Sequence, residues 1–157
     1  MASFGSQLEK FKDKTITRLD AVVYGTIFKL SRKLVERSPV GDWTWWKGRQ
    51  ISPGVYAGYA ESPIEGYVGG HFRANWQHGE SFVPSEELPG TRNDYLQRLN
   101  GTMSAKPSGK IHYIVNNTPY AQRIENGWSW HQQPNGVVGI SILEFPQFIR
   151  QSILEAK

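Results

Sequence analysis

Residues 3–39, SFGSQLEKFKDKTITRLDAVVYGTIFKLSRKLVERSP, carry the longest periodic pattern in the chain. Apolar side chains recur mostly every three or four residues, which predicts one helix with a single apolar stripe. Ser3 or Ser6 can cap its start, and Ser38-Pro39 ends it because the residue before a proline is pushed out of the helical region. The stripe consists of Phe4, Leu8, Phe11, Ile16, Leu19, Val22, Val23, Ile27, Leu30 and Leu34.

Such a helix is longer than a small domain can cover. At about 1.5 Å per residue, some thirty residues extend about 45 Å. We therefore expect part of the stripe to pack on a sheet and part on a neighbouring subunit.

The positive charge of the chain is concentrated in this helix. The net charge is +4, and residues 1–40 hold eight Lys/Arg against four Asp/Glu, whereas residues 41–157 hold ten of each. Lys29, Arg32 and Lys33 belong to a basic helix face that phosphates could contact. Acidic residues such as Glu36 interleave with them, so a solvated face is the favoured interpretation.

Composition indicates a folded, non-secreted protein of one domain. The 157 residues suit a single compact domain over 1–157, with 13% aromatic and 20% charged residues. No stretch is apolar enough to span a membrane, and the first residues lack the layout of a secretory signal. With no cysteine in the sequence, we expect a reducing cytoplasm or a particle assembled inside one.

An aromatic, glycine- and proline-rich segment follows the helix at residues 43–69. Its density of turn residues predicts an ordered excursion with one or two short strands, residues 55–60 being the first choice. Clustered aromatic side chains anchor protein interfaces, and they also stack on sugars or bases. We favour an interface, with candidate residues Trp43, Trp45, Trp46, Tyr56 and Tyr59.

The remaining chain predicts alternating short elements. Alternation of Phe72, Ala74 and Trp76 predicts a strand over 70–78, followed by a helix over 84–104 that Ser85 caps. Further strands are predicted over 110–116 and 137–143. Thr118 and Pro119 predict the start of a short helix that ends at Gly127, and a last helix from Phe145 is expected to bury Phe148, Ile149, Ile153 and Leu154.

The residues that carry chemistry form no coherent active site. His71, His78, His112 and His131 have no metal-site spacing such as HExxH, so structural or surface roles are expected. Glu125 is a carboxylate with no identifiable base or nucleophile beside it. The glycines match neither a P-loop nor a dinucleotide fingerprint. We expect no enzyme, cofactor or metal.

The order of three short motifs resembles a known family. After the long helix come SPVGD at residues 38–42, GHFRANW at 70–76 and IVNNTPYAQRIENG at 114–127. This arrangement resembles the phage neck and minor tail proteins of the tail-completion type, the minor tail protein Z-like group. The family patterns are "TPVDTG…LRASW", "NNTPYA…IE.G" and "G.S.QAP.GMV". The matching residues are Pro39, Arg73, Trp76, Asn116, Asn117, Pro119, Tyr120, Glu125 and Gly127.

The match has two departures and covers nearly the whole chain. Gly41-Asp42 replaces the family's "DTG", and residues 43–69 separate two elements that usually adjoin. The motif residues suit fold-making roles, since asparagine side chains satisfy backbone groups where a strand gives way to a helix.

The resemblance implies a fold and a place in a virion. The fold would be α+β, with the long amphipathic helix and shorter helices packed on a small, mainly antiparallel sheet of residues 54–60, 70–78, 110–116 and 137–143. The family forms a homo-oligomeric ring in the neck, six copies being the first choice, with the stripe and the excursion at its interfaces. Neighbours would be neck, tail-terminator or tail-tube proteins, with weak contact to DNA in the lumen.

Two other functions remain open from the sequence. The basic helix would suit a nucleic-acid-binding module, which salt-dependent DNA binding would reveal. The tryptophans of the excursion, with Trp128 and Trp130, would suit a glycan-binding tail component.

Overall fold

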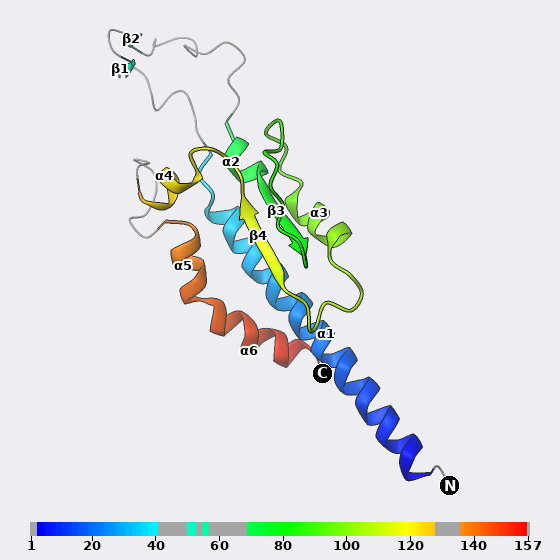
Figure 1. Ribbon diagram of the computed structural model, residues 1–157. Coiled ribbons are helices and arrows are strands. Elements are labelled where there is room, and N and C mark those ends of the chain that lie inside the picture. Colours follow the sequence, from blue (N-terminus) through cyan, green and yellow to red (C-terminus); the bar gives the residue numbers. More distant parts are fainter. Residues whose placement is uncertain (1–2, 41–49, 53–54, 57–68, 128–135, 157) are drawn as a thin grey trace.

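The chain folds as a mixture of helices and antiparallel strands, shown in Figure 1. This computed structural model describes residues 3–40, 50–52, 55–56, 69–127 and 136–156. In chain order the elements are α1 (Phe4–Arg37), β1 (Gln50–Ser52), β2 (Val55–Tyr56), α2 (His71–Ala74), β3 (Trp76–Glu80), α3 (Tyr95–Thr102), β4 (His112–Asn116), α4 (Ala121–Glu125), α5 (Val138–Leu143) and α6 (Phe145–Glu155).

Helix α1 confirms the prediction made from the apolar stripe. The Ser3 side chain accepts a hydrogen bond from the Ser6 N–H at its start, and Ser38 is its C-terminal cap. Asp20 is the first buried residue along the helix, and residues 7–19 are all exposed. Figure 1 shows this first half projecting away from the rest of the molecule. We call residues 4–19 the stem.

Two separate two-stranded sheets replace the predicted single sheet of four strands. Strands β3 and β4 pair antiparallel, with Trp76 opposite Asn116 and Glu80 opposite His112. Strand β4 confirms the strand predicted over 110–116. Strands β1 and β2 pair with each other, so the prediction over 55–60 holds for Val55–Tyr56, and residues 57–60 lie outside the described residues.

The strand predicted over 70–78 is wrong for its first half, which is the one-turn helix α2. Gly70 turns the chain with φ 107°, and its carbonyl accepts a hydrogen bond from the Ala74 N–H. Phe72 and Trp76 are four residues apart, a spacing that one face of a helix and one face of a strand share. That pair therefore does not distinguish the two structures, and Ala74, whose spacing from Phe72 favours a strand, lies at the end of the helical turn.

The strand predicted over 137–143 is also wrong, because this segment is helix α5. Its β-branched residues favour a strand, but the Glu125 carboxylate accepts hydrogen bonds from the first N–H groups of the segment. A partner from elsewhere in the chain thus stabilises the helical conformation.

Two predicted helices begin later than expected. Helix α3 starts at Tyr95, not near Ser85, because Pro89 and Gly90, which has φ 83°, interrupt the segment before it. Helix α4 starts at Ala121, not at Pro119, because the Thr118 side chain does not cap it. The end at Gly127 is confirmed, with φ 76° in the left-handed region.

The core lies where α1, the β3–β4 pair and α3 meet. One buried cluster comprises Leu34, Val35, Phe72, Trp76, Tyr95 and Val137, and a second comprises Ile27, Leu99 and Met103. Helix α6 packs along α1 and buries Phe148, as predicted. The prediction for Ile153 and Leu154 is wrong, since their side chains are 44% and 64% exposed.

Candidate functional site: a hydrogen-bonded joint and an exposed stem

The end of α1 is tied to α2 and β3 through Ser38. The Trp76 indole Nε1–H donates to Ser38 Oγ over 2.7 Å, and that hydroxyl donates to the Leu34 carbonyl. The Arg73 guanidinium donates to the Ser38 carbonyl over 3.1 Å. Ser38 is 2% exposed. Pro39, directly after this cap, keeps α1 from continuing.

The end of β4 meets the same place through asparagine side chains. Asn116 Nδ2 donates to the Phe72 carbonyl over 2.8 Å, while its Oδ1 accepts from the backbone N–H and the hydroxyl of Thr118. Asn117 Nδ2 donates to the carbonyls of Pro84 and Glu86. These contacts match the role expected for both asparagines. We call the cluster of Ser38, Phe72, Arg73, Trp76 and Asn116 the joint.

The aromatic ring of Tyr120 lies at the edge of the joint. Its centroid is 6.4 Å from that of Phe72 and 6.5 Å from that of His71. Pro119 and Tyr120 form the turn between β4 and α4. Matching residues from three separate segments, among them Pro39, Trp76 and Asn116, therefore gather around one point of the fold.

Asn75 is a structural residue that the sequence analysis missed. Its Nδ2 donates to the Leu88 carbonyl over 2.8 Å, and its Oδ1 accepts from the Leu88 N–H over 3.0 Å. The side chain is completely buried. This two-way pair holds the extended segment before α3 against the joint. The sequence feature that could have indicated this role is an asparagine placed between two apolar residues, Ala74 and Trp76.

Glu125 caps the start of α5 with its carboxylate. Its two oxygens accept the backbone N–H groups of Val137, Val138 and Gly139 over 2.8–2.9 Å. A Cβ on Gly136 would lie only 2.4 Å from the Glu125 carboxyl carbon, and Gly136 has φ 69°. This close approach requires glycine. Glu125, for which the sequence indicated no partner, thus has a structural role as the cap of α5.

His78 and His112 form a stacked, hydrogen-bonded pair between β3 and β4. Their ring centroids are 5.4 Å apart, and His78 Nε2 lies 3.1 Å from His112 Nδ1. His112 Nε2 faces the Pro107 carbonyl, which can only accept, so in the neutral ring His112 Nδ1 accepts from His78. His78 Nδ1 faces the Thr102 hydroxyl. Burial, and then the neighbouring His112, lower the pKa of His78.

His71 has the opposite electrostatic environment. Its Nε2 lies 2.8 Å from the Glu87 carboxylate, and its Nδ1 lies 2.7 Å from the Gly90 carbonyl. Both partners only accept hydrogen bonds, so this geometry suits the doubly protonated ring. The Glu87 carboxylate and then the Gly90 carbonyl raise the pKa of His71. The fourth histidine, His131, lies outside the described residues.

The candidate basic residues of α1 are paired within the chain. Lys29 Nζ contacts the Glu155 carboxylate and the Ser152 hydroxyl, while Arg32 and Lys33 both contact Glu36. Of the aromatic candidates, Trp43, Trp45, Trp46 and Tyr59 lie outside the described residues. Tyr56 belongs to β2, and the structure does not describe its side chain.

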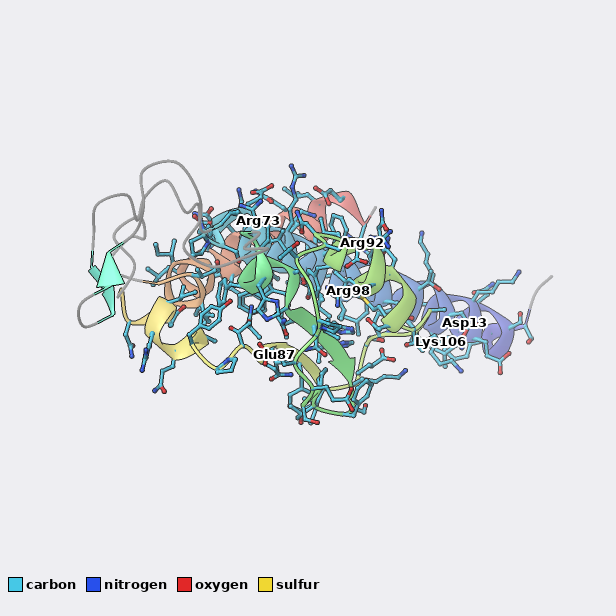
Figure 2. All side chains as sticks on the ribbon, turned by 90° about the horizontal axis from the view of Figure 1, so that it is seen from above. Asp13, Arg73, Glu87, Arg92, Arg98 and Lys106 are labelled. Atoms are coloured by element: carbon cyan, nitrogen blue, oxygen red, sulfur yellow. The ribbon has the colours of Figure 1, made fainter. Side chains whose placement is uncertain are left out.

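The stem carries large apolar side chains that none of the residues described by the structure covers. Phe4 is 80% exposed, Leu8 56% and Phe11 70%, and Ile16 and Leu19 are exposed as well. Figure 2 shows Asp13 out on the stem, away from Arg73 and Glu87 on the rest of the molecule. A contiguous exposed apolar stripe of this kind is typical of a protein interaction surface.

Among the described residues, no three His, Cys, Asp or Glu side chains come together in a way that could hold a metal ion. None of the described helices has the length and apolar character needed to cross a membrane. Comparisons of the chain with protein-family models, with curated proteins and with solved structures found no match.

Proposed function

We propose that the chain is a structural virion protein of a tailed phage, forming a ring at the head-proximal end of the tail and helping to join tail to head. The proposal rests on the motif resemblance, and the joint is the observation that carries it. Trp76 bonds Ser38 across 38 residues of sequence, and Asn116 bonds Phe72 across 44. The segments that carry the family-like motifs thus bond one another, as the shared fold implied by the resemblance would require.

Assembly into a ring is supported by the exposed apolar side chains. Away from the stem, Phe82, Val83 and Ile111 are exposed near one end of the β3–β4 pair, and Ile142, Leu143 and Leu154 are exposed on α5 and α6. A closed ring needs a head-to-tail interface that joins two different surfaces of neighbouring copies. The chain offers more than one such surface, and a ring of six copies is the stoichiometry that we propose.

The nucleic-acid alternative receives less support from the same residues. Lys29, Arg32 and Lys33 are held in ion pairs with Glu155 and Glu36, so phosphate contacts there would have to displace carboxylates. The glycan alternative depends on tryptophans outside the described residues. We therefore keep the structural role as the proposed function.

The test is assembly of the phage that encodes this chain. We expect a mutant lacking it to accumulate separate heads and tails, and purified protein added to that lysate to restore infectious particles. Electron microscopy of the restored particle should place the chain in the neck. Complete particles formed without the chain, or a position in a tail fibre, would overturn the proposal.

A further inference from the structure

Helix α6 lies along one side of α1 and stops halfway. Ser152 packs so closely on Gly25 that a Cβ there would lie 3.0 Å from its hydroxyl oxygen, and Lys29 bonds Ser152 and Glu155. At the other end Arg37 pairs with Glu144, so the two helices run antiparallel. Figure 1 shows α6 ending beside the middle of α1, with the stem continuing beyond it.

Three apolar residues of the stem, Phe4, Leu8 and Phe11, lie on the side of α1 that α6 covers further along. Gly25 and Lys29 contact α6, and Val22 precedes Gly25 by three positions. Steps of three, four or seven residues keep a residue on the same face of a helix. Continuing in such steps toward the N-terminus leads to one cation, Arg18, and then to Thr15, Phe11, Leu8 and Phe4. The stem therefore extends the α6-binding face of α1, and in the stem this face is exposed.

Charge identifies the kind of helix that fits this face. Where α6 covers it, α1 supplies cations and α6 supplies carboxylates, in the pairs Lys29–Glu155 and Arg37–Glu144. The stem again supplies cations, since Lys10, Lys12, Lys14 and Arg18 outnumber Glu9 and Asp13 and leave a net charge of +2. If the stem of a second copy packed on this stem, two net charges of +2 would repel each other. Duplex DNA would match the cations but not Phe4, Leu8 and Phe11.

We propose that the stem binds an acidic amphipathic helix of a different protein, laid in line with α6. Its apolar side would cover Phe4, Leu8 and Phe11, and its carboxylates would pair with Arg18 on this face and with Lys12 and Lys14 beside it. This is the helix-on-helix arrangement that the chain already uses between α1 and α6. The proposal rests on these contacts alone and stands or falls independently of the virion assignment.

The test uses two synthetic helical peptides with the same leucine stripe, one flanked by glutamates and the other by lysines. Fluorescence anisotropy of the labelled peptides with the full chain at physiological salt measures both affinities. We expect the acidic peptide to bind at least tenfold more tightly than the basic one, which corresponds to about 1.4 kcal/mol. Equal affinities would overturn the proposal.

Stem variants locate the binding. Leu8→Ser combined with Phe11→Ser should weaken the binding of the acidic peptide at least tenfold. Leu154→Ser, which changes a similarly exposed leucine on α6, should leave the affinity unchanged. Lys12→Glu combined with Lys14→Glu should reverse the preference toward the basic peptide. Circular dichroism should show the same thermal midpoint for all variants, since these side chains are exposed.

Two outcomes would assign the stem to another partner and overturn the proposal. The first is concentration-dependent self-association in sedimentation that Leu8→Ser/Phe11→Ser abolishes, which would indicate a second copy. The second is duplex DNA binding that Lys12→Glu/Lys14→Glu abolishes and Leu8→Ser/Phe11→Ser leaves intact. Failure of either kind leaves the head–tail joining assay unaffected, so the two proposals are separable.

Discussion

At the scale of single residues, Glu125 has the clearest effect on local structure. Its carboxylate accepts hydrogen bonds from three successive N–H groups at the start of α5. We predict that Glu125→Ala lowers the free energy of unfolding by about 2 kcal/mol, because charge-assisted cap hydrogen bonds are lost. Urea denaturation followed by circular dichroism measures the change.

The control for this variant is Glu86→Ala, which removes an exposed carboxylate and should change stability by less than about 0.5 kcal/mol. Gly136→Ala should destabilise in the same direction as Glu125→Ala, since the added Cβ collides with the Glu125 carboxylate. Equal stability of Glu125→Ala and the wild type would show that α5 does not need this cap.

The pair of His78 and His112 predicts a loss of stability in acid. The pKa of His78 is lowered in the fold, so the unfolded chain binds a proton more readily as the pH falls below 6.5. The stability from neutral His78 is therefore complete above pH 6.5 and is lost as the pH falls through its folded pKa. Urea midpoints at pH 7.5 and 5.5 should differ less in His78→Gln than in the wild type; an unchanged difference would contradict this.

His71 predicts the reverse dependence. Its pKa is raised by Glu87 and the Gly90 carbonyl, so its stabilising contribution is complete below pH 6.5 and is lost as the pH rises through the folded value. The wild type should lose part of its free energy of unfolding between pH 6 and pH 8.5, and His71→Gln should not show this loss. Because the two histidines act in opposite directions, each variant must be compared over its own pH range.

At the scale of elements, sequence periodicity predicted the helices and strands whose conformation is determined by their own residues. Helix α1 has a long stripe, a serine cap and a proline stop, and β4 and α6 were also predicted near their observed positions. The strands predicted over 70–78 and 137–143 are wrong for residues 71–74 and for the whole of 137–143, where helices α2 and α5 form instead. Their helical form depends on Gly70 and on Glu125, and the second of these contacts comes from another part of the chain.

The candidate site was predictable to a similar extent. The motifs pointed to Pro39, Arg73, Trp76 and Asn116, and the structure brings their segments together. Asn75 was missed because its partner Leu88 has no side-chain pattern that marks it; the bonds go to its backbone. The pairing of Lys29 with Glu155 spans most of the chain and leaves no local signal either.

The joint provides the prediction at this scale. Ser38→Ala removes the acceptor of the Trp76 indole N–H, and this buried donor would be left without a hydrogen bond. We expect a loss of about 1–3 kcal/mol in the free energy of unfolding, measured by guanidinium denaturation. Ser85→Ala, at an exposed serine, is the matched control. A loss no larger than the control's would show that the joint does not stabilise the fold.

At the scale of the whole molecule, the stem and the packed elements have separate roles. Asp20 marks the boundary, since its carboxylate accepts hydrogen bonds from the backbone N–H and hydroxyl of Ser108. These bonds lower the pKa of Asp20 and tie α1 to the segment before β4. Every side chain from residue 7 to 19 is exposed, so folding of the rest gains little from the stem.

Deletion of residues 2–18 should therefore remove all of the stem except Leu19 without unfolding the remainder. We expect the thermal midpoint to stay within about 3 °C of the wild type, because exposed positions contribute little to stability. Deletion of residues 2–24 also removes Asp20, which is hydrogen-bonded to Ser108, and Val23, which packs on the second core cluster. This longer deletion should clearly lower the thermal midpoint. Scanning calorimetry compares the two. If the shorter deletion destabilised as much as the longer one, the stem would belong to the folding unit, and its exposed stripe could no longer be explained as a surface reserved for a partner.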